Sequence, residues 1–244
     1  MEEKIQKSLI LLFSGVFAVI WITLWFTVAV YMNQSKKICL LALFLLILFL
    51  AAAFLNIRLS QRLRNSRRLW RILSCVLLVL MAAGLLYAGM ELKVYPGWDF
   101  GSVYQGAVEI VEDGAFSDNS NWYFTTYPNN VAVCMFLAAF FKVFGGLCSY
   151  ITLGILLNVF LILLGMVFTF FLAEKLYGSR AAFLVMLVCA LFLPFYMHAP
   201  IFYTDTFALP FVTGALLSYQ YRKKDARRLI LTAAVLAVGY KVKG

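Results

Sequence analysis

The chain has 244 residues, of which 64% are hydrophobic and 13% are charged, and its formal net charge is +10. An ordinary soluble domain carries about 25% charged residues, so this composition excludes that class. The basic residues cluster between apolar runs, as topology determinants do, and this placement argues against nucleic acid as a partner.

Apolar runs follow one another along the chain, and a membrane-spanning helix needs about 20 such residues. The uncharged runs cover residues 8–31, 38–57, 72–90, 150–173, 181–197 and 206–221, with shorter runs at 131–141 and 229–240. The sequence therefore predicts an all-α, polytopic bundle of membrane helices. Five scattered cysteines and a single histidine form no zinc-binding motif.

The positions of the basic residues predict how the chain crosses the membrane. Residues 58–71 include six arginines and no acid, and residues 222–228 include five basic residues and one acid, so both should face the cytoplasm. Both do so only if the run at 131–141 does not cross. Its eleven residues make about 16 Å of helix, half a bilayer. We therefore expect it to lie at the surface or to re-enter, which makes residues 91–149 one outer segment.

That outer segment begins with an acid at the lipid–water boundary. In "VYPGWDFGSVY", residues 94–104, Asp99 stands among aromatic residues, just before an amphipathic helix that should begin near Ser102 and end at Gly114. Glu109 belongs to the polar face of this helix. Asp99 either caps the helix or acts as a base or ligand, since ionisable residues near membrane depth are costly and often functional.

A second polar segment that interrupts the apolar pattern is "TTYPNN", residues 125–130. Its side chains Tyr127, Asn129 and Asn130 either form a turn before a surface helix or line a polar pocket.

A third such segment is "HAPIFYTDTFALP", residues 198–210, where two prolines should break the helical pattern. Asp205 follows the first break and, by the crossing count, returns to the same face as Asp99. It is either the cap of the next helix or the second carboxylate of a shared site.

These motifs occur in an order that resembles the GT-C membrane glycosyltransferases, the superfamily of protein O-mannosyltransferases and lipid A aminoarabinose transferases. The resembling stretches are "WDFGSVY", "YFTTYPNN", "KVFGG", "FFLAEKLYGSRAAFL" and "APIFYTDTFALPF". The resemblance covers residues 72–244, and residues 1–71 look like two accessory helices with an arginine-rich cytoplasmic loop.

The resemblance implies transfer of a sugar from a polyprenyl-phosphate donor to an acceptor hydroxyl or amine, at the outer face of a bacterial plasma membrane. It implies that Asp99 is the catalytic base and that Asp205 assists it or binds substrate. Membrane lipids and the lipid-linked donor are the expected partners. No cofactor is required by the sequence, although some relatives hold a divalent metal near such acids. The substrate-binding candidates are Tyr127, Asn129, Asn130, Lys142 and Lys93.

Three departures from the superfamily are visible. "TTYPNN" replaces the more usual "HPP" or "YPP", and Asn158 is the only strongly polar residue in a stretch where some members carry an arginine. The chain also has fewer helices, and the run at 229–240 is too short to cross. We therefore expect a fragment that lacks a C-terminal half and is inactive alone. The alternative function is a non-catalytic scaffold, or a transporter- or flippase-like component of cell-envelope assembly, although no internal repeat supports a transporter.

Overall fold

The structure is a computed structural model that describes residues 66–221 and 226–243, with nine isolated positions between residues 16 and 51. All regular elements in this part of the chain are helical, so the all-α prediction is confirmed. The chain divides into two compact units, Met1–Leu55 and Asn56–Gly244. In the first unit the nine described positions are helical; the rest of the runs expected at 8–31 and 38–57 lies outside the described residues.

The second unit opens with α4 (Arg67–Glu91), whose 25 residues make about 38 Å of helix. The helix begins where the Ser66 hydroxyl accepts a hydrogen bond from the backbone N–H of Leu69, at 3.3 Å. Its buried face recurs every three or four residues, as an amphipathic helix requires. The members of that face are Trp70, Ser74, Leu77, Met81, Leu85 and Ala88.

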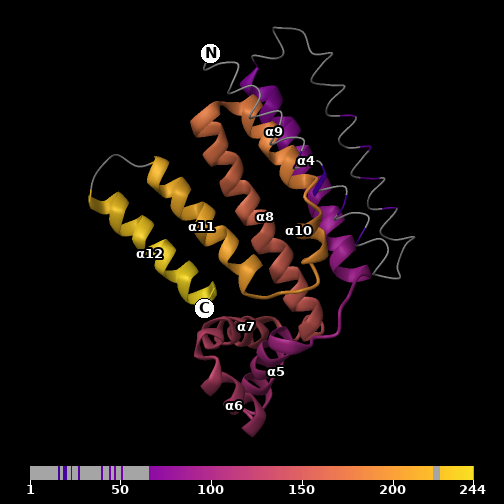
Figure 1. The fold of residues 1–244 in the computed structure, drawn as a ribbon, viewed down its shortest axis with the longest axis vertical. Coiled ribbons are helices and arrows are strands. Elements are labelled where there is room, and N and C mark those ends of the chain that lie inside the picture. The colour runs from indigo at the N-terminus through magenta and orange to yellow at the C-terminus, as the bar shows by residue number, and fades with distance from the viewer. Residues whose placement is uncertain are drawn as a thin grey trace. The chain divides into compact units, whose positions relative to one another are not determined.

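Three helices and a 3-10 turn follow, and together they make what we call the α5–α7 end of the bundle: α5 (Trp98–Glu112), α6 (Asp118–Thr126), η1 (Pro128–Asn130) and α7 (Val131–Phe144). Helix α5 begins earlier than expected, so Asp99 lies in its first turn rather than before it. Figure 1 shows these elements gathered beyond one end of α8, α11 and α12, with α7 running crosswise to them.

Helix α8 (Tyr150–Tyr177) is the longest element, about 42 Å for 28 residues. Among the described residues, α4 and α8 are the helices long and apolar enough to cross a membrane. A third span would need α6 and the Pro128–Phe144 stretch to count as one, yet these meet at 108°. A bend of this size occurs both in a broken span and in a re-entrant loop, so the expectation that residues 131–141 do not cross stays a prediction.

The run expected at 181–197 is broken into α9 (Ser179–Ala190) and α10 (Leu193–Met197). Pro194 has no N–H to donate to the carbonyl of Ala190, so a continuous helix would leave that carbonyl without its partner. The Tyr196 hydroxyl donates to it instead, at 2.7 Å. The helix therefore stops where a buried side chain can replace the missing backbone bond.

Helices α11 (Thr204–Tyr221) and α12 (Ala226–Lys243) complete the bundle. The expectation that two prolines break the chain here is wrong for Pro210, which lies inside α11. Helix α12 has 18 residues rather than about twelve, and Figure 1 shows it running alongside α11. Helix α11 also packs closely on α8, because a Cβ at Gly165 would lie 2.7 Å from Leu209 Cγ.

Candidate functional site

Asn130 joins three segments of the chain at the α5–α7 end. Its side chain is buried, with 3% of its surface exposed. The Asn130 Nδ2 donates to the Tyr123 hydroxyl at 2.6 Å, and its Oδ1 accepts from the Tyr203 hydroxyl at 3.2 Å. Asn129 Nδ2 donates to the same oxygen, also at 3.2 Å. With Asp99, these four residues form what we call the Asn130 cluster.

Both carboxylates predicted from the sequence act on this cluster. Burial raises the pKa of the Tyr123 hydroxyl, and interactions with Tyr203 and with the Asp99 carboxylate raise it further, against an opposing hydrogen bond from Asn130. Burial also raises the pKa of Tyr203, and the negative charges of Asp99 and Asp205 act in the same direction. The two acids therefore lie within electrostatic reach of one hydroxyl.

The hydrogen bonds of the Asn130 cluster have a fixed direction. Because the amide nitrogen of Asn130 donates to the Tyr123 oxygen, the single hydroxyl proton of Tyr123 must point to another acceptor. Asp99 interacts with that hydroxyl. A tyrosine hydroxyl is protonated at neutral pH even at its ordinary pKa, and the pKa of Tyr123 is raised further, so it can orient the carboxylate as a donor.

The segments that carry the two acids also pack directly against each other. Phe100 and Phe202 meet edge to face, with ring centroids 4.7 Å apart and an interplanar angle of 89°. Both rings are buried. Since Phe100 follows Asp99 and Phe202 precedes Tyr203, this contact fixes the start of α5 beside the approach to α11.

Asp205 itself is exposed and lies in the first turn of α11. Its carboxylate pairs with the ammonium group of Lys243 at the end of α12. Both side chains are more than half exposed, so solvent screens the pair and its contribution to stability is small. The pair nevertheless brings the end of α12 to the same place as Asp205.

A cleft of about 450 Å³ opens between α5 and α6, next to the Asn130 cluster. Polar side chains dominate its walls, and Tyr123 belongs to both the cleft and the cluster. Trp98, at its rim, is 97% exposed. Exposed aromatic side chains of this kind are typical of a membrane–water boundary. The remaining lining residues are Pro96, Gly97, Gly101, Ser102, Gln105, Glu109, Ser117, Asn119 and Ser120.

Glu109 corrects the assignment of the polar face of α5, because only 9% of its surface is exposed. It accepts hydrogen bonds from the Ser117 backbone N–H at 3.0 Å and from the Ser117 hydroxyl at 2.9 Å. Burial acts to raise the pKa of Glu109, but hydrogen bonds from Ser117, Ser120 and Gln105 outweigh it and leave the pKa lowered. Glu109 thus holds the α5–α6 connection at the wall of the cleft.

The other predicted substrate-binding residues lie outside the Asn130 cluster. Tyr127 is half-exposed and its ring centroid lies 5.1 Å from that of Tyr123. Lys93 is exposed in the connection between α4 and α5, and Lys142 is exposed in the last turn of α7. Within the described part of the chain, His, Cys, Asp and Glu form no group of three or more that could hold a metal ion.

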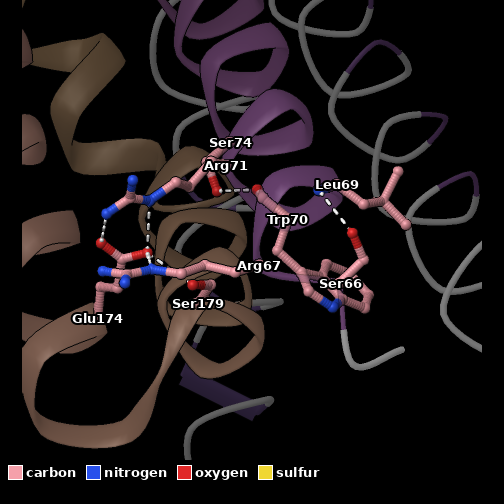
Figure 2. A network of polar contacts seen from close by, with 8 residues as sticks. All are labelled: Ser66, Arg67, Leu69, Trp70, Arg71, Ser74, Glu174 and Ser179. Carbon is pink, nitrogen blue, oxygen red and sulfur yellow. Dashed lines mark hydrogen bonds and ion pairs between the residues drawn. The ribbon is translucent and has the colours of Figure 1, made fainter. Parts of the chain in front are cut away.

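A second polar network lies at the opposite end of α8, which we call the Glu174 end. Figure 2 shows two arginines of α4 converging on Glu174. Arg71 donates to it through Nε at 2.8 Å and Nη2 at 2.7 Å, and Arg67 through Nε at 3.3 Å. The Ser179 hydroxyl adds a fourth bond at 2.6 Å. The Glu174 side chain is 2% exposed, so these donors compensate the cost of burying its charge.

Several of these residues were not found from the sequence. Tyr123 and Tyr203 lie within the motifs quoted above. A tyrosine close to an acid or amide at a membrane boundary could have indicated that they belong to the site. Glu174 was not among the candidate site residues. Two features of the sequence could have indicated its role. Glu174 is a lone acid near the end of one apolar run, and an arginine-rich segment, residues 58–71, comes just before another.

Comparison with known proteins places the chain in a family. Residues 3–243 match the family described as conserved hypothetical integral membrane protein. The chain belongs to this family. The match runs through both units, and together with the apolar helices α4 and α8 it identifies an integral membrane protein. No curated protein and no solved structure matches the chain.

Proposed function

We propose that this integral membrane protein transfers a sugar from a polyprenyl-phosphate donor to a hydroxyl or amine, at the outer face of a bacterial plasma membrane. The Asn130 cluster carries the proposal. It joins three of the five stretches on which the resemblance to GT-C glycosyltransferases rests, namely the stretch around Asp99, "YFTTYPNN" and the stretch that contains "FYTD". These motifs are separated by up to about a hundred residues in sequence.

Asp99 serves as the general base in this reaction. Its carboxylate is exposed in the first turn of α5, where the helix dipole stabilises negative charge. The carboxylate takes the proton of the acceptor while the acceptor oxygen or nitrogen bonds to the anomeric carbon. The bond from that carbon to the lipid phosphate breaks, and polyprenyl phosphate leaves with the electron pair. Tyr123, held by Asn130, orients the carboxylate.

The departing phosphate needs cationic partners as its negative charge develops. Lys93 and Lys142 are exposed candidates at this end of the bundle, and Lys243 is a third, which its contact with Asp205 places at the proposed site. Asp205 then has two roles, to hold Lys243 in place and to bind the acceptor. The open cleft between α5 and α6 gives a polar acceptor an approach to Tyr123.

The decisive experiment measures release of polyprenyl phosphate, because this product is common to every acceptor. Purified full-length protein in vesicles of anionic and zwitterionic lipid is given polyprenyl phosphates carrying radiolabelled hexoses or pentoses, together with extracted cell-envelope lipids and glycans as acceptors. We expect Asp99→Asn to reduce release about 10²- to 10⁴-fold, the usual contribution of a general base.

The matched control is Asp118→Asn, since Asp118 also lies in the first turn of a helix at this end of the bundle but outside the Asn130 cluster. We expect it to keep activity within about twofold of the unmodified protein. Equal activity of the Asp99 and Asp118 variants would remove the catalytic role of Asp99. Failure of every donor to bind would favour the scaffold alternative, whereas binding without release is the outcome expected of a chain that is inactive alone.

A further inference from the structure

An irregular stretch of backbone, residues 198–203, lies beside the third turn of α8. Asn158 is eight residues from the start of α8, about 12 Å along the helix. If α8 centres its 42 Å on a hydrocarbon layer of about 30 Å, this level is inside the layer. Irregular backbone at such depth is tolerated only where protein groups satisfy its polar atoms.

The side-chain amide of Asn158 donates hydrogen bonds to the backbone carbonyls of this stretch. Its Nδ2 donates to the carbonyl oxygens of His198 at 2.7 Å, Ala199 at 3.0 Å and Ile201 at 3.2 Å. The side chain is fully buried. Its Oδ1 has no hydrogen-bond partner among the described residues, so the amide is oriented for the carbonyls at the expense of its own oxygen.

One turn before Asn158, Gly154 on the same face of α8 contacts Phe202, the next residue of the stretch. A Cβ at Gly154 would lie 2.5 Å from the ring of Phe202, so only glycine leaves room for that ring. Phe202 in turn packs on Phe100, next to Asp99. Gly154 and Asn158 are thus two adjacent contacts, at i and i+4, that α8 makes with the stretch.

We propose that Asn158 is the positioning residue of the site: it fixes residues 198–203 so that Tyr203 reaches Asn130 and α11, with Asp205 in its first turn, begins at the α5–α7 end. Its importance for turnover rests on the proposed sugar transfer. Its effect on position does not, because the carbonyls it holds lie two to seven residues before Tyr203 and Asp205 in the chain. An amide is needed, since an apolar side chain of similar size donates nothing to three buried acceptors.

The test measures position without turnover. In the full chain freed of native cysteines, Thr204→Cys is the reporter for the site, because Thr204 begins α11 and only 3% of its surface is exposed. Glu112→Cys, at an exposed position of α5, is the reference. Labelling rates with a charged thiol reagent are compared as the ratio of residue 204 to residue 112. We expect Asn158→Leu to change this ratio by about fivefold or more, because local opening exposes the segment it no longer holds.

The control variant is Thr169→Val, in the same helix. It removes a hydroxyl that donates within α8, to the carbonyl of Gly165 at 2.8 Å. It should leave the ratio within about twofold. A ratio unchanged by Asn158→Leu would overturn the proposal. So would equal changes at both reporters, because these would indicate general loosening rather than a displaced segment.

Asn158→Asp keeps the test decisive if the leucine variant does not fold. A protonated carboxyl can donate one hydrogen bond to the carbonyls, whereas the ionised form donates none. We expect the ratio to exceed that of the unmodified reporter and to rise with pH, while it stays constant with Asn158 present. A ratio that matches the Asn158 protein at every pH would contradict the assignment. Activity loss plays no part in this readout, so failure of sugar transfer would leave it intact.

Discussion

Two adjacent asparagines at the α5–α7 end have different surroundings, although the sequence treats them alike. Asn130 is buried and uses both ends of its amide, whereas Asn129 is exposed and donates one hydrogen bond to its neighbour. A single position in "TTYPNN" therefore links Tyr123 to Tyr203. The difference arises because η1 turns one amide inward and the preceding one outward.

This contrast predicts unequal costs for the same substitution. Asn130→Asp would place a carboxyl oxygen where Nδ2 now donates to Tyr123 at 2.6 Å. Tyr123 would then have one proton for two carboxylates, this one and Asp99, so one of the two hydrogen bonds is lost, and we expect a loss of about 1–3 kcal/mol in the free energy of unfolding. Asn129→Asp should cost less than about 0.5 kcal/mol, as exposed substitutions do. Denaturant unfolding in detergent micelles measures both, and equal losses would contradict the central place of Asn130.

Glu109 gives a second residue-scale prediction, on pH. Its pKa is lowered in the folded protein, so its contribution to stability is present above the unfolded pKa and is lost as pH falls through the folded pKa. Glu109→Gln should lower Tm at neutral pH, and the difference should shrink in acid as the native carboxyl becomes protonated. Thermal unfolding across acidic and neutral pH checks this, with Glu112→Gln, on the exposed face of α5, as the control. A pH-independent difference would count against the ionised carboxylate.

At the scale of elements, the Glu174 end joins three helices through one carboxylate. Glu174 belongs to α8, its two arginines to α4, and Ser179 to the first turn of α9. Trp70 adds an aromatic contact, with its ring centroid 5.3 Å from that of Phe183 in α9. The turn at Gly178, with φ of +86°, brings the start of α9 back toward Glu174. Polar bonds and packing thus act at the same junction.

The two arginines should contribute unequally to this junction. Arg71 makes two hydrogen bonds of 2.7 and 2.8 Å, while Arg67 makes one at 3.3 Å and is the more exposed. Double-mutant cycles with Glu174→Gln should give a coupling energy of about 1–2 kcal/mol for Arg71→Gln and less for Arg67→Gln, because solvent screens the outer pair. Coupling of Arg67 equal to or larger than that of Arg71 would show that the observed geometry does not govern stability.

At the scale of the whole second unit, the described helices place Asp99 and Asp205 at one end and the Glu174 junction at the other. Cysteines introduced at Asp99, Lys142 and Asp205 should therefore react with an impermeant reagent from one side of the membrane. A cysteine at Tyr177, which is exposed next to the α8–α9 turn, should react only from the opposite side. Labelling of intact cells and of inverted vesicles makes the comparison. Reaction of residues 177 and 205 from the same side would disprove this topology.

The sequence was sufficient for the class of fold because bilayer thickness and charge placement constrain helices strongly. The run at residues 131–141 is an example, since its eleven apolar residues predict a short helix and α7 is one. Contacts between distant segments were less accessible. Nothing in the periodicity of α5 shows that Glu109 turns inward to Ser117, and nothing near Pro210 shows that α11 continues through it. These outcomes depend on partners supplied by tertiary packing, which pattern alone does not reveal.

Helix α8 is held at two points along its length, by Asn158 and by Glu174, which are sixteen positions and about 24 Å apart. Because α8 is bonded to its neighbours at both points, it cannot slide along them. In a bilayer that is too thick or too thin, the bundle would have to tilt as one body or the lipid would have to deform around it. Hydrophobic mismatch should then shift the orientation of the protein in the bilayer while the internal spacing of its helices stays unchanged.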